Sequence, residues 1–396
     1  MDSRDDLAML TTLAFANYRS LRSLVIPLGQ LNLVTGPNGS GKSNLYRALR
    51  LLADSANGRV GAALAREGGL TSALWAGPEH ISRRMCQGEV PVEGTLRRDP
   101  VALKLGFAGE DFGYAIDMGF PPPPKFPTAF ALDPEIKCES IWSGPFLRSS
   151  NVLLDRRGTM ARVRDGRSWR VVSDHLDRFE SIFTQMADPE RAPEVMRVRE
   201  TIRGWRFYDH FRSDHDAPSR QAQLGTRTVV LSHDGADLAA AWQTILEIGD
   251  ADSLINAVDD AFPGATVTIS VSDGRFTLLF MQPGLLRPLT AMELSDGTLR
   301  YLTWIAALHT PRPPPLMVLN EPETSLHPDL LPALARLITQ AASHTQMWVV
   351  SHASRLVSAL EQQPACQTIM LEKDFSQTRV VGQGALDEPA WYWPER

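Results

Sequence analysis

Apolar and polar positions alternate at the start of the chain and give way to helical spacing further on. The alternation through residues 9–35 predicts short strands, and the last of them, Leu31–Thr35, is apolar enough to be buried. Residues 43–54 carry leucines three and four positions apart, as one face of an amphipathic helix does. The N-terminal pattern therefore predicts strands followed by a helix.

After Pro283 the pattern alternates between helices and short apolar strands. Helical spacing runs through 299–308 and 330–342, and the unbroken apolar runs 316–319 and 347–350 predict buried strands. This alternation indicates an α/β fold.

The middle of the chain is less regular and predicts mainly hairpins. Val101–Phe120 is the first, with a turn near Gly109, and the prolines at 121–124 predict a rigid loop after it. Thr266–Met281 is the clearest, because Asp273-Gly274 favours a two-residue turn between two alternating runs.

Between these two hairpins lie three strand-like pieces and one helix-like stretch. The strands are expected at 150–154, 160–164 and 169–172, and the helix from Ala192 to about Phe207. We interpret this region as a mixed α+β insert between two α/β ends.

One nine-residue run constrains the chemistry more than any other part of the chain. It fits the phosphate-binding pattern G-x-x-x-x-G-K-[ST] between the predicted strand and the predicted helix. Its glycines permit backbone angles that turn successive N–H groups into one concavity, and the helix start adds partial positive charge. Lys42 is placed for the β- and γ-phosphates and the Ser43 hydroxyl for Mg²⁺, so the run predicts binding of a nucleoside triphosphate. The candidate nucleotide-binding residues are Gly36, Asn38, Gly39, Ser40, Gly41, Lys42, Ser43 and Asn44.

Polar residues at the ends of the later strands are candidates for catalytic residues. The strand at 316–319 runs into Asn320 and Glu321, and Glu321 is placed to orient, or take a proton from, an attacking water. The strand at 347–350 runs into Ser351-His352, and His352 is able to hydrogen-bond a γ-phosphate and report its hydrolysis. Together with Lys42, Glu321 and His352 are the candidate catalytic residues.

A second helix start precedes the strand that carries Glu321. Ser295 and Gly297, within Leu294–Thr298, lead into the helix at 299–308 and make an anion-binding N-terminus. Such a segment is often only a helix cap. Its position just before the Glu321 strand favours a nucleotide contact instead.

Charge and composition restrict the partners. The net charge of −6 argues against a protein that coats nucleic acid indiscriminately, although residues 148–227 hold 16 arginines against 12 acidic residues. No apolar run approaches 18 residues, and the N-terminus lacks the basic-then-apolar pattern of a signal segment. We expect a cytoplasmic protein with no membrane partner.

Taken together, the motifs resemble the ABC-type ATPase heads of the RecF, SMC and overcoming-lysogenization-defect (OLD) groups, specifically the smaller stand-alone AAA-family ATPases without a nuclease domain. The resemblance rests on the phosphate loop, on Leu294–Thr298, on Asn320–Pro328 and on Ser351-His352. Leu231–Leu238 is similar to the segment with which such proteins return from their insert to the head. The resemblance implies a P-loop NTPase fold, an α/β head with a mixed α+β insert.

This head would be assembled from separate stretches of the chain. We expect 1–80 to be its N-terminal part, with the phosphate loop, and 81–230 to be the mixed α+β insert. Residues 231–282 would form the return segment and the hairpin, and 283–396 the C-terminal part with the remaining motifs.

The resemblance also implies an ATPase site shared between two copies of the chain. Ser295 and Gly297 of one head would close on the γ-phosphate held by Lys42 of the other, with Thr324–Pro328 at the interface. ATP binding would close a head-to-tail homodimer, and hydrolysis would release it. The implied ligands are ATP and Mg²⁺, and the implied partner is a second copy.

One departure from the family pattern concerns the metal. The position before the catalytic glutamate is usually an aspartate that holds Mg²⁺ through water, and here it is Asn320. A neutral amide contributes no charge to the metal, which points to slow turnover or weak Mg²⁺ binding. Ser43 and Asn320 are therefore the candidate metal-site residues. The glutamine loop of these heads is not placed, since Gln87 has no supporting context.

The sequence lacks segments that characterise several members of these ATPase groups. No C-x-x-C pair is present, which excludes a zinc hook, and no heptad repeat is present, which excludes long coiled-coil arms. The 44 residues that follow His352 are too few for an appended nuclease domain, and we expect none.

Three other interpretations stay open. The first is a DNA-binding repair or replication factor of RecF type, in which ATP clamps the heads on duplex. The second is a regulatory ATPase subunit for a separately encoded effector, such as a nuclease in a phage-defence pair. The third is a scaffold that binds ATP without hydrolysing it. A transporter subunit is disfavoured, because the long mixed insert resembles none of their short helical subdomains.

Overall fold

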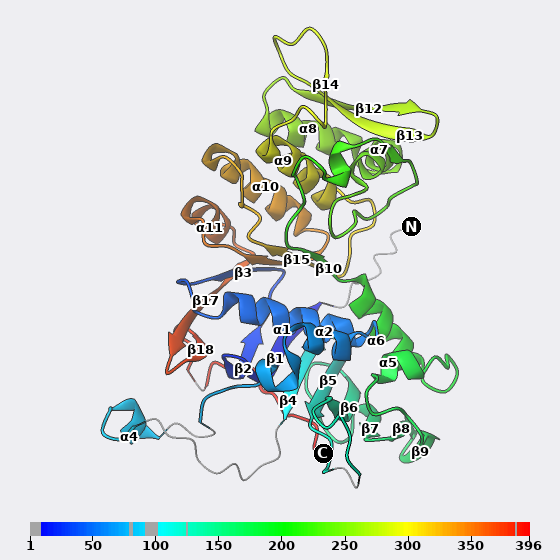
Figure 1. Ribbon diagram of the computed structural model, residues 1–396, viewed down its shortest axis with the longest axis vertical. Coiled ribbons are helices and arrows are strands. Elements are labelled where there is room, and N and C mark those ends of the chain that lie inside the picture. Colours follow the sequence, from blue (N-terminus) through cyan, green and yellow to red (C-terminus); the bar gives the residue numbers. More distant parts are fainter. Residues whose placement is uncertain (1–8, 79–81, 92–101, 124–125, 385) are drawn as a thin grey trace. The chain divides into compact units, whose positions relative to one another are not determined.

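The computed structural model describes residues 9–78, 82–91, 102–123, 126–384 and 386–396 (Figure 1). The chain divides into two compact units, each assembled from separate stretches of sequence. Unit 1 comprises residues 1–28, 36–204 and 369–396, and unit 2 comprises residues 29–35 and 205–368.

Unit 1 is built on an antiparallel sheet, and its central strands are buried along nearly their whole length. In the described part of the chain the strand order is β2-β1-β4-β5-β6-β7-β8-β9, and each neighbouring pair is antiparallel. The strands are β1 (Leu10–Tyr18), β2 (Leu21–Pro27), β4 (Leu103–Gly109), β5 (Phe112–Gly119), β6 (Glu135–Ser143), β7 (Val152–Arg157), β8 (Met160–Asp165) and β9 (Ser168–Ser173).

Helices and one further hairpin complete unit 1. The helix α1 follows the predicted phosphate loop, and its leucines are buried as the spacing predicted. The helices are α1 (Lys42–Ser55), α2 (Val60–Arg66), α3 (Gly69–Ala73), α4 (Arg83–Cys86), α5 (Ile182–Gln185) and α6 (Pro193–Gly204). The hairpin pairs β17 (Cys366–Asp374), which starts at the end of unit 2, with β18 (Gln377–Val380).

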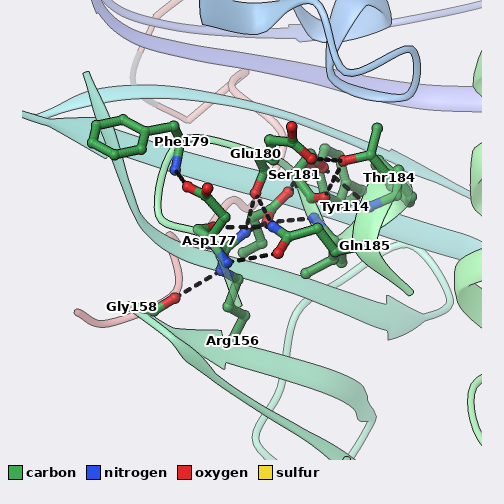
Figure 2. Close-up of polar contacts among 12 residues, drawn as sticks. Tyr114, Arg156, Gly158, Asp177, Phe179, Glu180, Ser181, Thr184 and Gln185 are labelled. Atoms are coloured by element: carbon green, nitrogen blue, oxygen red, sulfur yellow. Dashed lines mark hydrogen bonds and ion pairs between the residues drawn. The ribbon is translucent and has the colours of Figure 1, made fainter. Parts of the chain in front are cut away.

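A buried ion pair fastens the segment after β9 to the antiparallel sheet. Arg156 on β7 and Glu139 on β6 have fully buried side chains, and Arg156 Nη1 lies 2.7 Å from Glu139 Oε2. The same carboxylate accepts hydrogen bonds from Tyr114 OH and Ser181 Oγ, each of 2.6 Å. Arg156 also donates to three backbone carbonyl oxygens, those of Gly158, Asp177 and Glu180 (Figure 2). These hydrogen bonds compensate the desolvation of both charges.

Unit 2 is built on a parallel sheet with the strand order β10-β15-β16-β3. Unbroken apolar runs are typical of parallel strands that are buried on both faces. The strands are β10 (Arg206–Tyr208), β15 (Leu316–Asn320), β16 (Gln346–Val350) and β3 (Leu31–Thr35).

One face of this sheet packs into a helical core. Tyr208, Leu319, Val349 and Leu33 pair in register across the four strands, so their side chains share a face. All four belong to one buried apolar cluster with residues of the surrounding helices. Those helices are α7 (Leu238–Ile248), α8 (Ala251–Ala261), α9 (Asp296–Leu308), α10 (Leu331–Ala341) and α11 (Ser354–Glu361).

A small antiparallel sheet and two short 3-10 turns complete unit 2. The sheet contains the hairpin of β12 and β13, whose bounds match the predicted strands of 266–272 and 275–281. Its strands are β11 (Gln223–Leu224), β12 (Thr266–Ser272), β13 (Arg275–Met281) and β14 (Leu289–Thr290), and the turns are Pro218–Arg220 and Pro328–Leu330.

The helix predicted from Ala192 to about Phe207 is present, but its predicted end is wrong. Helix α6 stops at Gly204, and Arg206–Tyr208 forms β10 instead. Glycine ends helices readily, and the aromatic residues after it favour a strand that pairs with β15. The hairpin expected from Val101 is confirmed as β4 and β5, although Val101 itself, like Pro124 of the predicted proline loop, lies outside the described residues.

None of the helices in the described ranges has both the length and the apolar composition needed to cross a bilayer.

Candidate nucleotide site

The predicted phosphate loop joins the end of β3 to the start of α1. Gly36, Gly39 and Gly41 have positive φ angles of 141°, 80° and 111°. A Cβ at Gly36 would overlap the carbonyl oxygen of Leu371, and one at Gly41 would overlap Oγ1 of Thr378. Glycine is therefore required at both positions by backbone angle and by space.

The N-terminus of α1 is available to an anion. The helix begins at Lys42, and no side chain in the described part of the molecule caps it. Lys42 Nζ donates to the carbonyl oxygens of Gly36, at 2.6 Å, and Pro37, at 3.1 Å, which holds its ammonium against the loop. Ser43 is exposed in the first turn. The helix dipole and the ammonium together favour a phosphate group at this position.

The hairpin of β17 and β18 supports the loop. Thr378, buried on β18, donates from Oγ1 to the carbonyl oxygen of Ser40 at 2.8 Å. Oγ of Ser20 lies 2.7 Å from Thr378 Oγ1, and Asn44 Nδ2 donates to Ser20 Oγ at 2.8 Å. Asn44, predicted to bind nucleotide, thus joins α1 to the turn between β1 and β2. No motif in the sequence pointed to Ser20 or Thr378.

In unit 2, Glu321 and His352 lie together at the carboxyl edge of the parallel sheet. Asn320 at the end of β15 pairs with Val350 at the end of β16, and Glu321 N donates to Val350 O at 2.8 Å. His352 Nδ1 lies 3.6 Å from Glu321 Oε1. Strand β3 is parallel to β16 and ends at the same edge with Thr35, the residue that precedes the phosphate loop.

Glu321 has a backbone conformation that is unusual for its residue type. Its φ angle is 49°, in the left-handed region. That conformation costs a residue with a Cβ about 1–2 kcal/mol. Such strain persists where the surrounding structure holds it, and it concentrates at functional sites. The strained backbone at Glu321 carries a half-exposed carboxylate, which lies beside His352.

A second carboxylate, Glu323, was not predicted from the sequence. Its side chain is 7% exposed, and its Oε1 accepts hydrogen bonds from Ser351 Oγ, His352 N and Ala353 N at 2.8, 3.0 and 3.2 Å. The same oxygen lies 3.5 Å from His352 Nδ1. Glu323 therefore fixes the turn that carries His352. The run Asn320–Pro328 contained it, but a carboxylate two residues past Glu321 gave no signal of that contact.

The segment around Ser295 starts helix α9. Ser295 is exposed, and its Oγ caps the helix by accepting a hydrogen bond from Thr298 N at 3.2 Å. A Cβ at Gly297 would lie 3.0 Å from the carbonyl oxygen of Ser325. The buried Arg220 holds the segment from the other side, since its Nη2 lies 2.6 Å from Asp296 Oδ1.

Arg300 on α9 links this helix to the loop after Glu321. Its Nη1 donates to the carbonyl oxygen of Thr324 at 3.1 Å, and its Nη2 lies 2.9 Å from His210 Nε2. Burial and the positive charge of Arg300 lower the pKa of His210 below its ordinary value. Neutral His210 then accepts the guanidinium's hydrogen bond.

The predicted site residues fall into two groups. The phosphate-loop residues Gly36 to Asn44 belong to unit 1, whereas Ser295, Gly297, Asn320, Glu321 and His352 belong to unit 2. Unit 2 brings Glu321 beside His352 and Gly297 beside the loop that follows Glu321.

The phosphate loop fits a nucleotide phosphate. Gly39 has open space around it among the described residues, and the buried Oγ of Ser40 has no hydrogen-bond partner within those same ranges. No three His, Cys, Asp or Glu side chains of the described residues gather as a metal site. Mg²⁺ at such sites is usually held by substrate phosphates with one or two protein groups, for which Ser43 and Asn320 are the predicted candidates.

The fold is that of an ABC-type ATPase head of the SMC kind, within the P-loop NTPase class. A solved structure titled as the SMC head bound to the C-winged helix domain of ScpA aligns with 94% of this chain and 97% of its own, at 12% identity and a TM-score of 0.52. Two further SMC head domains align over similar spans. The head from Thermotoga maritima covers 95% of this chain and 100% of its own, at 13% identity and a TM-score of 0.47. The head with an extended coiled coil, bound to the C-terminal domain of ScpA and derived from Pyrococcus furiosus, covers 94% of this chain and 96% of its own. Its identity is 11% and its TM-score 0.48.

The family is given by the sequence itself. Residues 31–358 match the family described as "AAA domain, putative AbiEii toxin, Type IV TA system", so the chain belongs to this family of AAA-domain proteins. The predicted fold, an α/β P-loop head, is thereby confirmed. No curated protein matches the sequence significantly.

Proposed function

We propose that this protein binds ATP with Mg²⁺ and hydrolyses it, and that nucleotide binding closes two copies head to tail. The observation that carries the proposal is the glycine-built loop, which leads directly into the uncapped N-terminus of α1 with Lys42 at its start. This combination binds phosphate through backbone N–H groups, helix dipole and ammonium at once.

Each side chain has a proposed role that follows from its chemistry. Lys42 neutralises the β- and γ-phosphates, and the exposed Ser43 hydroxyl binds Mg²⁺. Glu321 orients the attacking water, and His352 hydrogen-bonds the γ-phosphate. His352 is suited to this because its turn is fixed by Glu323 while its own side chain is 54% exposed. Bound Mg²⁺ would supply charge stabilisation for the transferred phosphoryl group.

The dimer is supported by what unit 2 exposes. Ser295 and most of Thr324–Pro328, the residues expected to meet a second copy, are exposed. Two identical sites shared in this way require a two-fold axis.

Phosphate release by the purified protein tests hydrolysis directly. Wild type is expected to release phosphate from ATP slowly, Lys42→Ala to lose nucleotide binding, and Glu321→Gln to bind ATP without turnover. Asp216→Asn is the matched control, because Asp216 is an exposed carboxylate whose ion-pair partner is the neighbouring His215. Equal rates in wild type and Glu321→Gln would contradict hydrolysis through Glu321 and leave only an ATP-binding scaffold.

A nucleic-acid-linked function is the second candidate, and a basic surface on unit 1 favours it. The guanidinium carbons of Arg162 and Arg164 lie 4.6 and 4.5 Å from the ring centroid of Trp169. Arg162 and Trp169 border a cavity of about 400 Å³ that Arg148 and Arg157 also line, together with the acidic Asp155 and Glu395. Binding of DNA that weakens with salt and with Arg164→Glu would support this function; salt-independent binding would argue against it.

A further inference from the structure

We infer that the free edge of β12 in unit 2 is an interface at which a second copy of the chain adds its own β12, antiparallel about Ile269. Strand β12 pairs with one side of β13, and β11 and β14 pair with the other side of β13. In the described part of the chain no strand pairs with the outer edge of β12. The inference goes beyond the proposed function, because this contact needs no nucleotide.

Nothing in the sequence of β12 protects this edge. Edge strands are usually blocked by lysine, proline, a bulge or an inward-pointing charge. Residues 266–272 read Thr-Val-Thr-Ile-Ser-Val-Ser and contain no charged residue, proline or glycine. The pairing with β13 runs through the whole strand without a shift in register. Val271 is 57% exposed, so the edge presents apolar surface as well as backbone groups.

The hydrogen-bonding phase of the hairpin leaves three residues of β12 facing outward. Its turn, Asp273-Gly274, has φ angles of 50° and 72°, as a type I′ turn does. Such a turn hydrogen-bonds the pair that closes it, so Ser272 is bonded to β13 and every second residue before it is bonded likewise. No backbone hydrogen bond from another described segment reaches the alternate residues. The residues whose N–H and C=O groups point away from β13 are Val267, Ile269 and Val271.

The sequence of β12 matches itself in the antiparallel direction. Hydroxyl and β-branched apolar side chains alternate symmetrically about Ile269. With a two-fold axis at Ile269, hydroxyl meets hydroxyl on one face of the sheet and apolar side chain meets apolar side chain on the other, as in favourable cross-strand pairs. The pairs are Thr266 with Ser272, Val267 with Val271, Thr268 with Ser270, and Ile269 with Ile269 of the second copy.

The same register satisfies the free backbone groups. It places Val267 opposite Val271 of the second copy, and Ile269 opposite itself, so the outward N–H and C=O groups of the two strands meet each other. Like charges directly opposite one another destabilise a strand pair, and a strand that pairs with its own copy brings its own charges together. The absence of charge from β12 therefore favours a second copy as the occupant.

The contact is small, and its size sets its strength. A seven-residue antiparallel edge is about 24 Å long and a sheet about 10 Å thick, so the two copies together bury roughly 500 Å². Stable complexes bury about 1,200–2,000 Å². The chain is therefore a monomer at low micromolar concentration without nucleotide, and it associates through β12 as the concentration rises.

Sedimentation velocity of the full-length, nucleotide-free protein over a rising concentration series tests the association. The wild type is expected to show a reversible increase in its average sedimentation coefficient. Ser270→Lys changes an exposed residue and brings two ammonium groups close together across the axis, so it should weaken the association by more than about 10-fold. Thr277→Lys is the matched control, because Thr277 pairs with Ser270 one strand away from the edge, and it should associate as the wild type does.

Disulfide cross-linking tests the register. Thr268→Cys/Ser270→Cys places cysteines at a directly opposed pair of the two copies, with Cα atoms about 4.5 Å apart, within the range that a disulfide spans. Mild oxidation should convert it to covalent dimers. Thr266→Cys/Ser270→Cys places its cysteines out of register and should give no more dimer than the wild type, which controls for the three native cysteines.

Three results would overturn the inference. They are a wild type that stays monomeric at every concentration, a Ser270→Lys variant that associates as the wild type does, and equal cross-linking of the two cysteine variants. The first would leave the edge to a strand of another protein or to none. Lys42→Ala should associate through β12 unchanged, so failure of nucleotide binding and failure of this inference are distinguishable.

Discussion

Replacing Glu323 by alanine removes the group that fixes the turn carrying His352. Three hydrogen bonds end on Oε1, from Ser351 Oγ, His352 N and Ala353 N. Ala353 N keeps a second acceptor, Ser351 Oγ at 3.2 Å, so two hydrogen bonds are lost without replacement. Hydrogen bonds to charged groups contribute about 1.5–3 kcal/mol each. Because removal of a buried carboxylate also removes its desolvation cost, we expect the lower end, about 3 kcal/mol off the free energy of unfolding.

Glutamine at the same position separates the hydrogen bonds from the charge. Its amide oxygen is able to accept the same donors, so Glu323→Gln should cost about 1 kcal/mol, the net value of a neutral hydrogen bond. Urea unfolding measures both variants. Hydrogen exchange of the peptide that spans Ser351 to Glu361 reports whether the turn itself loosens. Phosphate release should fall further in the alanine variant than in the glutamine variant, because His352 is no longer held.

Glu361→Ala is the control for this comparison, since Glu361 is an exposed glutamate at the end of α11 and its loss should change stability by less than about 0.5 kcal/mol. Equal losses in Glu323→Ala and Glu323→Gln would refute the reasoning, because the carboxylate would then act through charge alone. Unchanged exchange across the His352 turn in the alanine variant would refute it as well.

Two further predictions concern unit 1. Gly41→Ala should abolish ATP-analogue binding in a fluorescence titration, because its Cβ would overlap Thr378. Gly39→Ala has open space and should only weaken binding. An equal loss of binding in both variants would show that the overlap with Thr378 is not the cause. Arg156→Met should lower the free energy of unfolding by about 3–5 kcal/mol in urea, since it leaves Glu139 as an uncompensated buried charge, and Arg156→Met with Glu139→Leu should recover much of that loss. A loss below about 1 kcal/mol in the single variant would contradict the expected cost of breaking this buried pair.

The sequence predicted the elements whose patterns are local. Periodicity located α1, the hairpin of β12 and β13, and the apolar strands β15 and β16 to within a few residues. The glycines of the phosphate loop were predictable because their positive φ angles are a local requirement. Helix α6 was extended too far because local spacing carries no information on the strand β15 that recruits Arg206–Tyr208.

Contacts between distant segments were not predictable from local patterns. Thr378 meets Ser40 across 338 positions, and neither residue stands in a pattern that signals the other. Glu323 and Ser351 meet only because β15 and β16 are neighbours in the parallel sheet. Strand order and register decide these contacts, and a single sequence without pairing information specifies neither.

The oligomeric state of Glu321→Gln with and without ATP tests the central claim most directly. We expect a monomer without nucleotide and, with ATP and Mg²⁺, a species of twice the 43.8 kDa chain mass by light scattering after size exclusion. Glu321→Gln/Lys42→Ala should stay monomeric under both conditions. A Glu321→Gln protein that binds ATP and still remains a monomer would contradict the shared-site switch.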